Sequence, residues 1–315
     1  MISRGTTSFA RLFLIQLVLV NHCDSINGIR FKFTSPTLAF ISGLLAVISF
    51  SSFRLKIKSV VKNLVFPFVL INIIYYIFYL VGKLIIISHG YGHLFYSPPP
   101  KLSLLGLFDG VILNPVNGPF WFLRNLIISH FVLISLISLP KNICILLTLI
   151  SLILILHLKP GDRFYSPYCA GGLCGFFLKT DFGETVFKKL NNNISDLYKA
   201  SIMVISGLLF VLFINQKWNQ HEPFSAILSG PIFFCVLICG SRFIKTAGEQ
   251  NIDRFSFFIF ASHSAIIGGI KLLLNILHLD SVLLLPVLKY AFANIFCLFF
   301  FLSFSRKIFS IKVLR

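Results

Sequence analysis

The sequence predicts an all-α fold, a polytopic membrane helix bundle of about ten transmembrane helices with both termini cytoplasmic. Of its 315 residues, 57% are hydrophobic and only 12% are charged, whereas soluble domains usually have about 25% charged residues. The mean hydropathy is +0.89, and the 37 phenylalanines suit a surface that faces lipid. These values exclude an ordinary soluble domain, and we expect residues 1–315 to form one integral-membrane domain.

Ten apolar segments are candidates to cross a bilayer, which needs about 20 apolar residues for each helix. The fifth and sixth are the weakest, and the sixth, FYSPYCAGGLCGFFL, is short and rich in glycine. The ten segments are 8–23, 35–53, 64–88, 119–139, 142–158, 164–178, 198–216, 224–241, 255–278 and 283–305.

The distribution of Lys and Arg predicts the orientation of the bundle. If the N-terminus is inside, most Lys and Arg residues between the spans fall in cytoplasmic segments, as the positive-inside rule requires. Both ends of the chain are then cytoplasmic. Basic loops that face anionic lipid also explain the net charge of +18 without a nucleic-acid partner.

The seven cysteines do not follow a zinc or disulfide pattern. Most lie within apolar spans, and Cys235 and Cys239 have no second pair or histidine cluster to complete a metal site. We therefore expect the cysteines to be small apolar residues, and we expect no metal. The chain also lacks the motifs GxxxxGK[ST], GxGxxG, HExxH and GxSxG, so nucleotide hydrolysis and serine-triad chemistry have no support.

The first span has a cation near one end and a histidine at the other. Arg11 and His22 are separated by almost three helical turns, so their side chains project from nearly the same face, about 16 Å apart along the axis. Charged and titratable groups in a bilayer are costly and usually functional. A structural role is equally open for each residue alone, Arg11 as an interface anchor and His22 as a helix-end residue.

Two later spans also have polar residues at helical spacing. Trp121 and Arg124, in GPFWFLRNL, are neighbours on a helix and fit either an interfacial aromatic belt or a binding site. Ser256 and His263, in SFFIFASH, share one helix face, and His263 lies about half-way along its span. A histidine at that depth usually faces the bundle interior or a wet cavity. There it is either hydrogen-bonded to a neighbouring helix or reactive.

A basic loop, RLKIKSVVKNLVFPF at 54–68, precedes the third span. Its cations favour either a role in topology or an anion site at the cytosolic surface. Lys58 and Lys62 are the two cations nearest to the span.

In this order, these segments resemble the integral-membrane acyltransferase-3 family, which includes O-acetyltransferases of bacterial polysaccharides and lipopolysaccharide. Arg11 and His22 match the arginine, ten residues and histidine of the family's opening motif. Four segments are similar to later parts of the family: FTSPTLAFISGLL at 33–45, KSVVKNLVFPF, GPFWFLRNL and SFFIFASH. The family usually has ten spans, and it often has two arginines where this chain has Lys58 and Lys62.

The resemblance implies one acyltransferase domain over residues 1–315. It would transfer an acyl group, most commonly acetyl, from acyl-CoA to a hydroxyl of a cell-surface or exported polysaccharide, or of its lipid-linked precursor. His22 would be the general base or the acyl carrier, and His263 a second base or a proton relay. The remaining residues would have two roles: site shaping and oxyanion stabilisation by Trp121, Arg124 and Ser256, and donor binding by Arg11, Lys58 and Lys62.

The resemblance also implies the partners and the location. Acetyl-CoA or another acyl-CoA would be a donor substrate rather than a bound cofactor, and a glycan or lipid-linked sugar would be the acceptor. Membrane lipids and polysaccharide-assembly proteins would surround a multi-pass protein of the bacterial inner (cytoplasmic) membrane. The main alternative is a transporter or flippase of a lipid-linked sugar, although the chain shows no inverted repeat or pair of broken helices. A polysaccharide polymerase is a third alternative.

Overall fold

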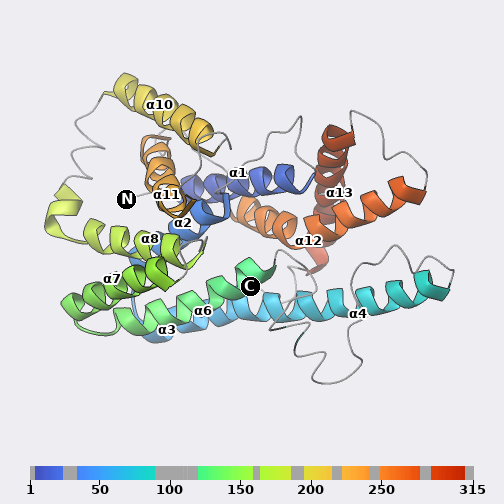
Figure 1. Cartoon of the computed structure of the whole chain (residues 1–315), viewed down its shortest axis with the longest axis horizontal. Helices are drawn as coiled ribbons and strands as arrows, with labels where there is room; N and C mark the ends of the chain where they lie inside the picture. Colours follow the sequence, from blue (N-terminus) through green and yellow to red (C-terminus); the bar gives the residue numbers. More distant parts are fainter. Residues whose placement is uncertain are drawn as a thin grey trace.

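Every described element of the computed structural model is a helix, which confirms the predicted all-α class (Figure 1). The structure describes residues 4–23, 34–88, 109, 112, 120–158, 164–185, 195–214, 222–240, 249–276 and 285–308. The elements, in chain order, are α1 (Arg4–His22), α2 (Thr34–Ile48), α3 (Phe53–Val60), the π-helical η2 (Val61–Val65), α4 (Phe66–Ser88), α6 (Phe120–Ile137), α7 (Lys141–Leu158), α8 (Tyr165–Leu178), α10 (Asp196–Ile214), α11 (Glu222–Gly240), α12 (Glu249–Ile276) and α13 (Leu285–Ile308).

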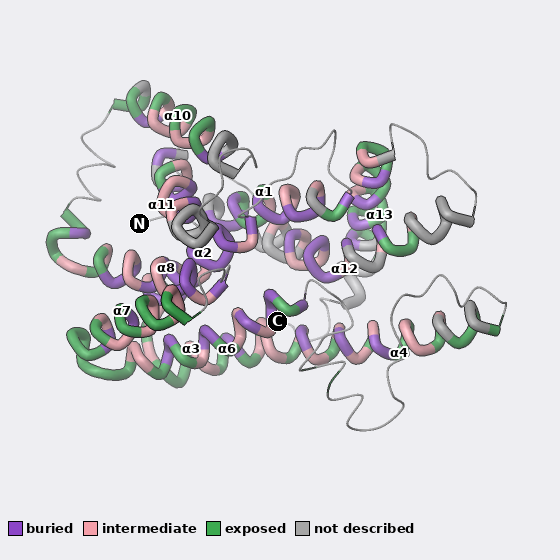
Figure 2. The backbone as a smooth tube through the Cα atoms, viewed as in Figure 1, coloured by how far each residue is buried: buried purple, intermediate pink, exposed green. Residues whose placement is uncertain are grey.

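Within the described residues, four helical segments are long and apolar enough to cross a membrane: Phe53–Gly82, Phe120–Ile137, Lys141–Leu158 and Pro286–Ser303. Only 11% of the α7 segment is buried within the protein, so its outer face presents apolar side chains to the surroundings (Figure 2). Such a face suits contact with lipid, where apolar side chains need no protein cover. Parts of α1, α2, α10 and α11 form shorter apolar helices.

The α2 helix packs closely against α8 because glycines line both sides of their crossing. A Cβ atom at Gly43 would overlap the backbone carbonyl of Tyr168, and one at Gly171 would overlap that of Phe40. Small residues permit this backbone approach between helices in membranes. On its other side, α2 contacts α11, where the Thr37 hydroxyl donates to Ser229 Oγ at 3.0 Å. The three helices therefore form a tight layer at one side of the core (Figure 1).

The segment predicted as a basic loop at 54–68 is helical, so that expectation is wrong. Ser52 caps the start of α3 by accepting a hydrogen bond from the Leu55 amide at 3.4 Å. The helix then continues through η2 into α4. Pro67 lies within this continuous helix, two residues after the end of η2, and its missing N–H removes one helical hydrogen bond there. The cations of this segment are thus fixed on helix faces rather than on a loop.

The α1 helix lies against α2 and α12, and it is also tied to α13. The Tyr290 hydroxyl of α13 donates to Gln16 Oε1 at 2.8 Å. Between α12 and α13, Ser262 Oγ lies 3.4 Å from Cys297 Sγ. These contacts fix α1 beside the middle of α12, although the two helices are far apart in the sequence.

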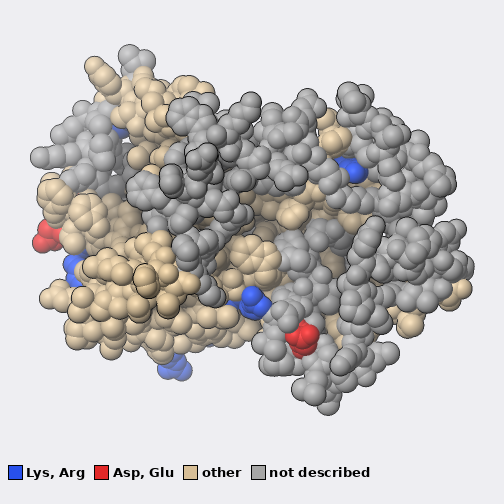
Figure 3. All heavy atoms as spheres, viewed as in Figure 1, with Lys and Arg blue, Asp and Glu red and all other residues tan. Residues whose placement is uncertain are grey.

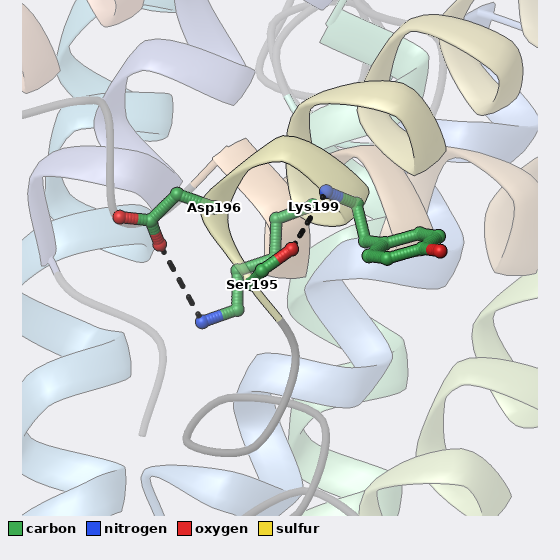
Figure 4. A network of polar contacts seen from close by, with 4 residues as sticks. Ser195, Asp196 and Lys199 are labelled. Atoms are coloured by element: carbon green, nitrogen blue, oxygen red, sulfur yellow. Dashed lines mark hydrogen bonds and ion pairs between the residues drawn. The ribbon is translucent and has the colours of Figure 1, made fainter.

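Charged side chains are sparse over the described part of the surface (Figure 3). One ion pair lies in the first turn of α10, where Lys199 Nζ is 4.0 Å from Asp196 Oδ1 (Figure 4). Ser195 Oγ accepts from the Tyr198 amide at 3.4 Å, and so satisfies one of the free amides at the helix start. Asp196 also suits the positive end of the helix dipole. The polar contacts therefore define where α10 begins.

Candidate functional site

The structure brings together the two histidines that the sequence singled out as candidate bases. His22 is the last residue of α1, and His263 lies near the middle of α12. Their ring centroids are 5.1 Å apart, and the ring planes are inclined by 48°. His22 is exposed, whereas His263 is only 1% exposed. One imidazole therefore faces the surroundings, and the other lies behind it in the core.

The hydrogen bonds of His263 define which of its nitrogens is basic. Its Nδ1 lies 3.0 Å from the Ile259 carbonyl oxygen and 2.9 Å from that of Phe260. Carbonyl oxygens only accept, so Nδ1 has the hydrogen and donates it. The neutral ring then has its lone pair on Nε2, which is buried and has no hydrogen-bond partner. A buried acceptor without a partner is costly and calls for an explanation.

Aromatic rings connect the histidine pair to the start of α6. Phe260 lies 6.2 Å from His263, and its ring is 5.9 Å from that of Phe122. Trp121 packs edge-on against Phe122 at 5.8 Å and against Phe164 at 6.4 Å. Trp121 is 39% exposed. Two aromatic rings, those of Phe122 and Phe260, therefore separate Trp121 from His263.

Arg124 and Ser256 occupy different places from the pair. Arg124 is half-buried, and its Nε donates to Asn125 Oδ1 at 3.2 Å. The Ser256 hydroxyl is buried and donates to the Ile252 carbonyl at 2.8 Å. Ser256 is two helical turns before His263, about 10 Å along the axis. Ser256 does share the face of His263, as predicted, but its hydroxyl is not within hydrogen-bond reach of the imidazole.

About three turns before His22, near the middle of α1, Arg11 lines a polar cavity of about 480 Å³. Lys56 of α3 contributes a second cation, and its Nζ donates to Ser49 Oγ. Hydroxyl groups dominate the rest of the wall, and the complete lining is Thr7, Arg11, Ser49, Ser51, Leu55, Lys56 and Ser59. Two cations and four hydroxyls in one cavity suit a phosphate group, which accepts several hydrogen bonds and has negative charge.

Lys58 and Lys62 do not line this cavity. Lys58 is exposed and lies about 200° around α3 from Lys56, so it faces away from the cavity. Lys62 is half-buried in η2. The sequence singles out the cations nearest to the span, whereas the helical α3 turns Lys56 toward Arg11. The spacing of Lys56 and Ser59, which are neighbours on a helix, was the signal that would have identified this face.

A second buried histidine lies outside the motifs that the sequence singles out. His130 of α6 is 9% exposed, and its Nδ1 lies 2.9 Å from the Leu126 carbonyl oxygen and 3.1 Å from the Tyr168 hydroxyl. Its ring therefore pairs with a tyrosine of α8 instead of another histidine. Among the described residues, no group of three or more His, Cys, Asp or Glu side chains is arranged to hold a metal ion.

No protein-family model, curated protein or solved structure matches the chain. The functional argument therefore depends on the geometry of the site and on the motifs in the sequence.

Proposed function

We propose that the protein is a membrane O-acyltransferase that moves an acyl group, most commonly acetyl, from acyl-CoA to a hydroxyl of a cell-surface or exported polysaccharide or its lipid-linked precursor. The observation that supports this most is the contact of His22 with His263, at 5.1 Å between ring centroids. The two residues were selected from separate motifs, at opposite ends of the sequence. Their proximity in space is what a shared proton-transfer centre requires.

Histidine suits this chemistry because its unperturbed pKa is near neutrality. In the proposed step, an imidazole nitrogen removes the proton of the acceptor hydroxyl while the oxygen attacks the thioester carbonyl. The tetrahedral intermediate collapses to the ester and expels the CoA thiolate, which takes the proton back from the imidazolium. In a second route, the imidazole attacks first and forms an acyl-histidine, which the hydroxyl then opens. Both routes consume one thioester and release one thiol.

The cavity around Arg11 and Lys56 supports a cytosolic donor site. The phosphates of acyl-CoA are anionic, and the cavity offers two cations and several hydroxyls. Arg11 and His22 are about 16 Å apart along α1, a length that an extended pantetheine arm is suited to cover. The thioester would then lie near the histidine pair while the nucleotide part of the donor stays at the cavity.

The proposal includes a membrane topology. All ten apolar segments cross the inner membrane of a bacterium, and both termini are cytoplasmic. The excess of Lys and Arg in the predicted cytoplasmic segments supports this orientation. The cavity is then on the cytosolic side, and the acceptor reaches His22 from the outer side.

The test uses purified full-length protein in lipid nanodiscs with radiolabelled acetyl-CoA and a membrane-soluble sugar, n-octyl β-D-glucoside, as the acceptor. We expect label on the glucoside with the wild type and loss of transfer with His22→Ala. Retention of transfer by His130→Ala is the matched control, because His130 is a histidine outside the pair. Movement of a lipid-linked sugar across the bilayer without any transfer of label would favour the flippase instead. In cells, the O-acetyl content of surface glycans with and without the gene identifies the acceptor class.

A further inference from the structure

We infer that His22 and His263 together bind a divalent transition-metal ion such as Zn²⁺, and that the bound ion inhibits the protein reversibly. The binding part of this inference depends only on the geometry of the two rings. The inhibition part rests on the proposed function, because it requires the same imidazoles to act in acyl transfer.

The distance between the rings fits two ligands of one ion. Zn²⁺ binds imidazole nitrogen at about 2.0–2.1 Å with tetrahedral angles, which places the centroids of two bound imidazoles about 5 Å apart. The observed separation of His22 and His263 is 5.1 Å. The rings are inclined by 48° rather than stacked flat, and a shared ion requires one nitrogen of each ring to be directed at it.

The hydrogen bonding of His263 is also that of a metal ligand. Histidines that bind metal usually donate their other ring N–H to a carboxylate or a backbone carbonyl, which fixes the tautomer and the ring orientation. His263 does this through Nδ1, at 3.0 Å from the Ile259 oxygen and 2.9 Å from the Phe260 oxygen. Its Nε2 lone pair is buried without a partner. A metal ion at Nε2 would satisfy this atom.

Access and ligand number indicate a reversible site. His22 is exposed, so an ion can enter and leave past its ring. Among the described residues, no third His, Cys, Asp or Glu joins the pair, so water or another small ligand completes the coordination. Imidazole is a preferred ligand of Zn²⁺, Cu²⁺ and Ni²⁺ and a poor one for Mg²⁺ and Ca²⁺. We therefore expect selectivity for the transition metals.

Metal binding and proton transfer would use the same lone pair of an imidazole nitrogen. A nitrogen that binds a metal ion cannot take a proton, so metal binding and general-base catalysis exclude one another. Loss of a general base typically lowers the rate by about a hundred- to ten-thousand-fold. Saturating Zn²⁺ should therefore lower acyl transfer by at least about a hundred-fold, and a chelator should restore it.

Metal binding is measured first, without reference to activity. Metal-free protein in nanodiscs is dialysed against Zn²⁺, and its zinc content is measured by elemental analysis. Co²⁺ is a second probe, since tetrahedral Co²⁺ absorbs visible light. We expect specific binding by the wild type and its loss in His22→Gln and His263→Gln. Because His22 is exposed, His22→Gln should fold normally, so it decides the result if the His263 variant has a low yield.

His130→Gln is the matched control for these variants. Like His263, His130 is buried and has its Nδ1 within 3 Å of a backbone carbonyl oxygen, at 2.9 Å from Leu126. Its ring neighbour is Tyr168 instead of a histidine. We expect His130→Gln to bind zinc as the wild type does. Equal zinc binding by the wild type and His22→Gln would overturn the metal site.

Measurement of transfer then separates this inference from the proposed function. Zinc binding that requires both histidines, in a protein with no acyl transfer, would reject the acyltransferase and retain the metal site. Acyl transfer that Zn²⁺ does not inhibit would reject the inhibitory ion and retain the acyltransferase. If the metal site and the acyltransferase are both correct, Zn²⁺ should inhibit the wild type and His130→Gln alike, and a chelator should restore transfer in both.

Discussion

The Arg11 side and the His22 side of α1 have very different surroundings. On the Arg11 side, two cations and several hydroxyls line a cavity of about 480 Å³. On the His22 side, the partner histidine is buried among aromatic rings, and Phe260 lies 6.2 Å from it. Charge recognition favours the first kind of environment, where a cavity admits a solvated anion. Proton transfer favours the second, because a low dielectric strengthens each electrostatic interaction.

This difference suggests that one helix separates two tasks by depth. The anionic part of a donor is held near Arg11, and the reactive part is presented about 16 Å away. The same separation would keep the strongly charged nucleotide out of the apolar part of the bundle, where charges are costly.

The largest expected effect is on membrane topology, which decides whether Arg11 and His22 lie toward opposite sides of the membrane. If all ten apolar segments cross the bilayer and both termini are cytoplasmic, reporter proteins fused near residue 60 and after residue 315 should give an all-or-none cytoplasmic signal, and one near residue 95 an outside signal. Alkaline phosphatase and a fluorescent protein are suitable reporters. A cytoplasmic signal near residue 95 would place both ends of the third span on one side, and it would contradict the ten-span topology that puts the cavity and His22 on opposite sides of the membrane.

The next effect concerns the histidine end. His22→Ala should lower acyl transfer by about a hundred- to ten-thousand-fold while the protein still inserts, because it removes the base or the acyl carrier. His263→Ala should also lower transfer strongly, since the rings are in contact. Initial rates with labelled acetyl-CoA measure both losses.

Thermal unfolding of the same variants is the control for a merely structural role. A structural histidine would lower the midpoint of unfolding and leave most of the transfer activity. If His22→Ala keeps more than about a tenth of wild-type transfer, His22 is not the base, and His263 becomes the leading candidate.

A smaller effect is expected at the cavity. Arg11→Lys keeps the charge but removes the planar fork that binds phosphate through two parallel hydrogen bonds. We expect KM for acetyl-CoA to rise by about ten-fold, which corresponds to about 1.4 kcal/mol, with a smaller change in kcat. Steady-state kinetics at varied donor concentration measure this. A wild-type KM in Arg11→Lys would indicate that Arg11 only anchors the helix at the interface.

The sequence predicted most of the fold but only part of the candidate site. The apolar runs located ten of the described helices, all except α3 and η2, because the length and hydropathy of a membrane helix depend on local composition. The pairing of His22 with His263 needed the packing of α1 on α12, which no local pattern contains. Lys56 does not stand out in the sequence because the segment at 54–68 is predicted to be a loop, whereas it is helical in the structure. His130 was missed because its partner, Tyr168, lies on another helix.

The smallest effects test whether donor binding depends on the lysine in the cavity or only on the total positive charge of the helix. Lys56, Lys58 and Lys62 lie on the same continuous helix, but only Lys56 lines the cavity. We expect Lys56→Ala to raise KM for acetyl-CoA by several-fold to about ten-fold, as loss of a charge-assisted hydrogen bond does. Lys58→Ala and Lys62→Ala remove the same charge from positions outside the cavity, where a charge acts on the bound donor only from a distance. These two variants should therefore change KM by less than about three-fold at physiological salt, where distant charges are screened.

Equal effects of all three substitutions, declining together as salt is raised, would mean that the donor responds to a diffuse basic surface. The cavity around Arg11 would then not be the donor site, whatever the histidine variants show.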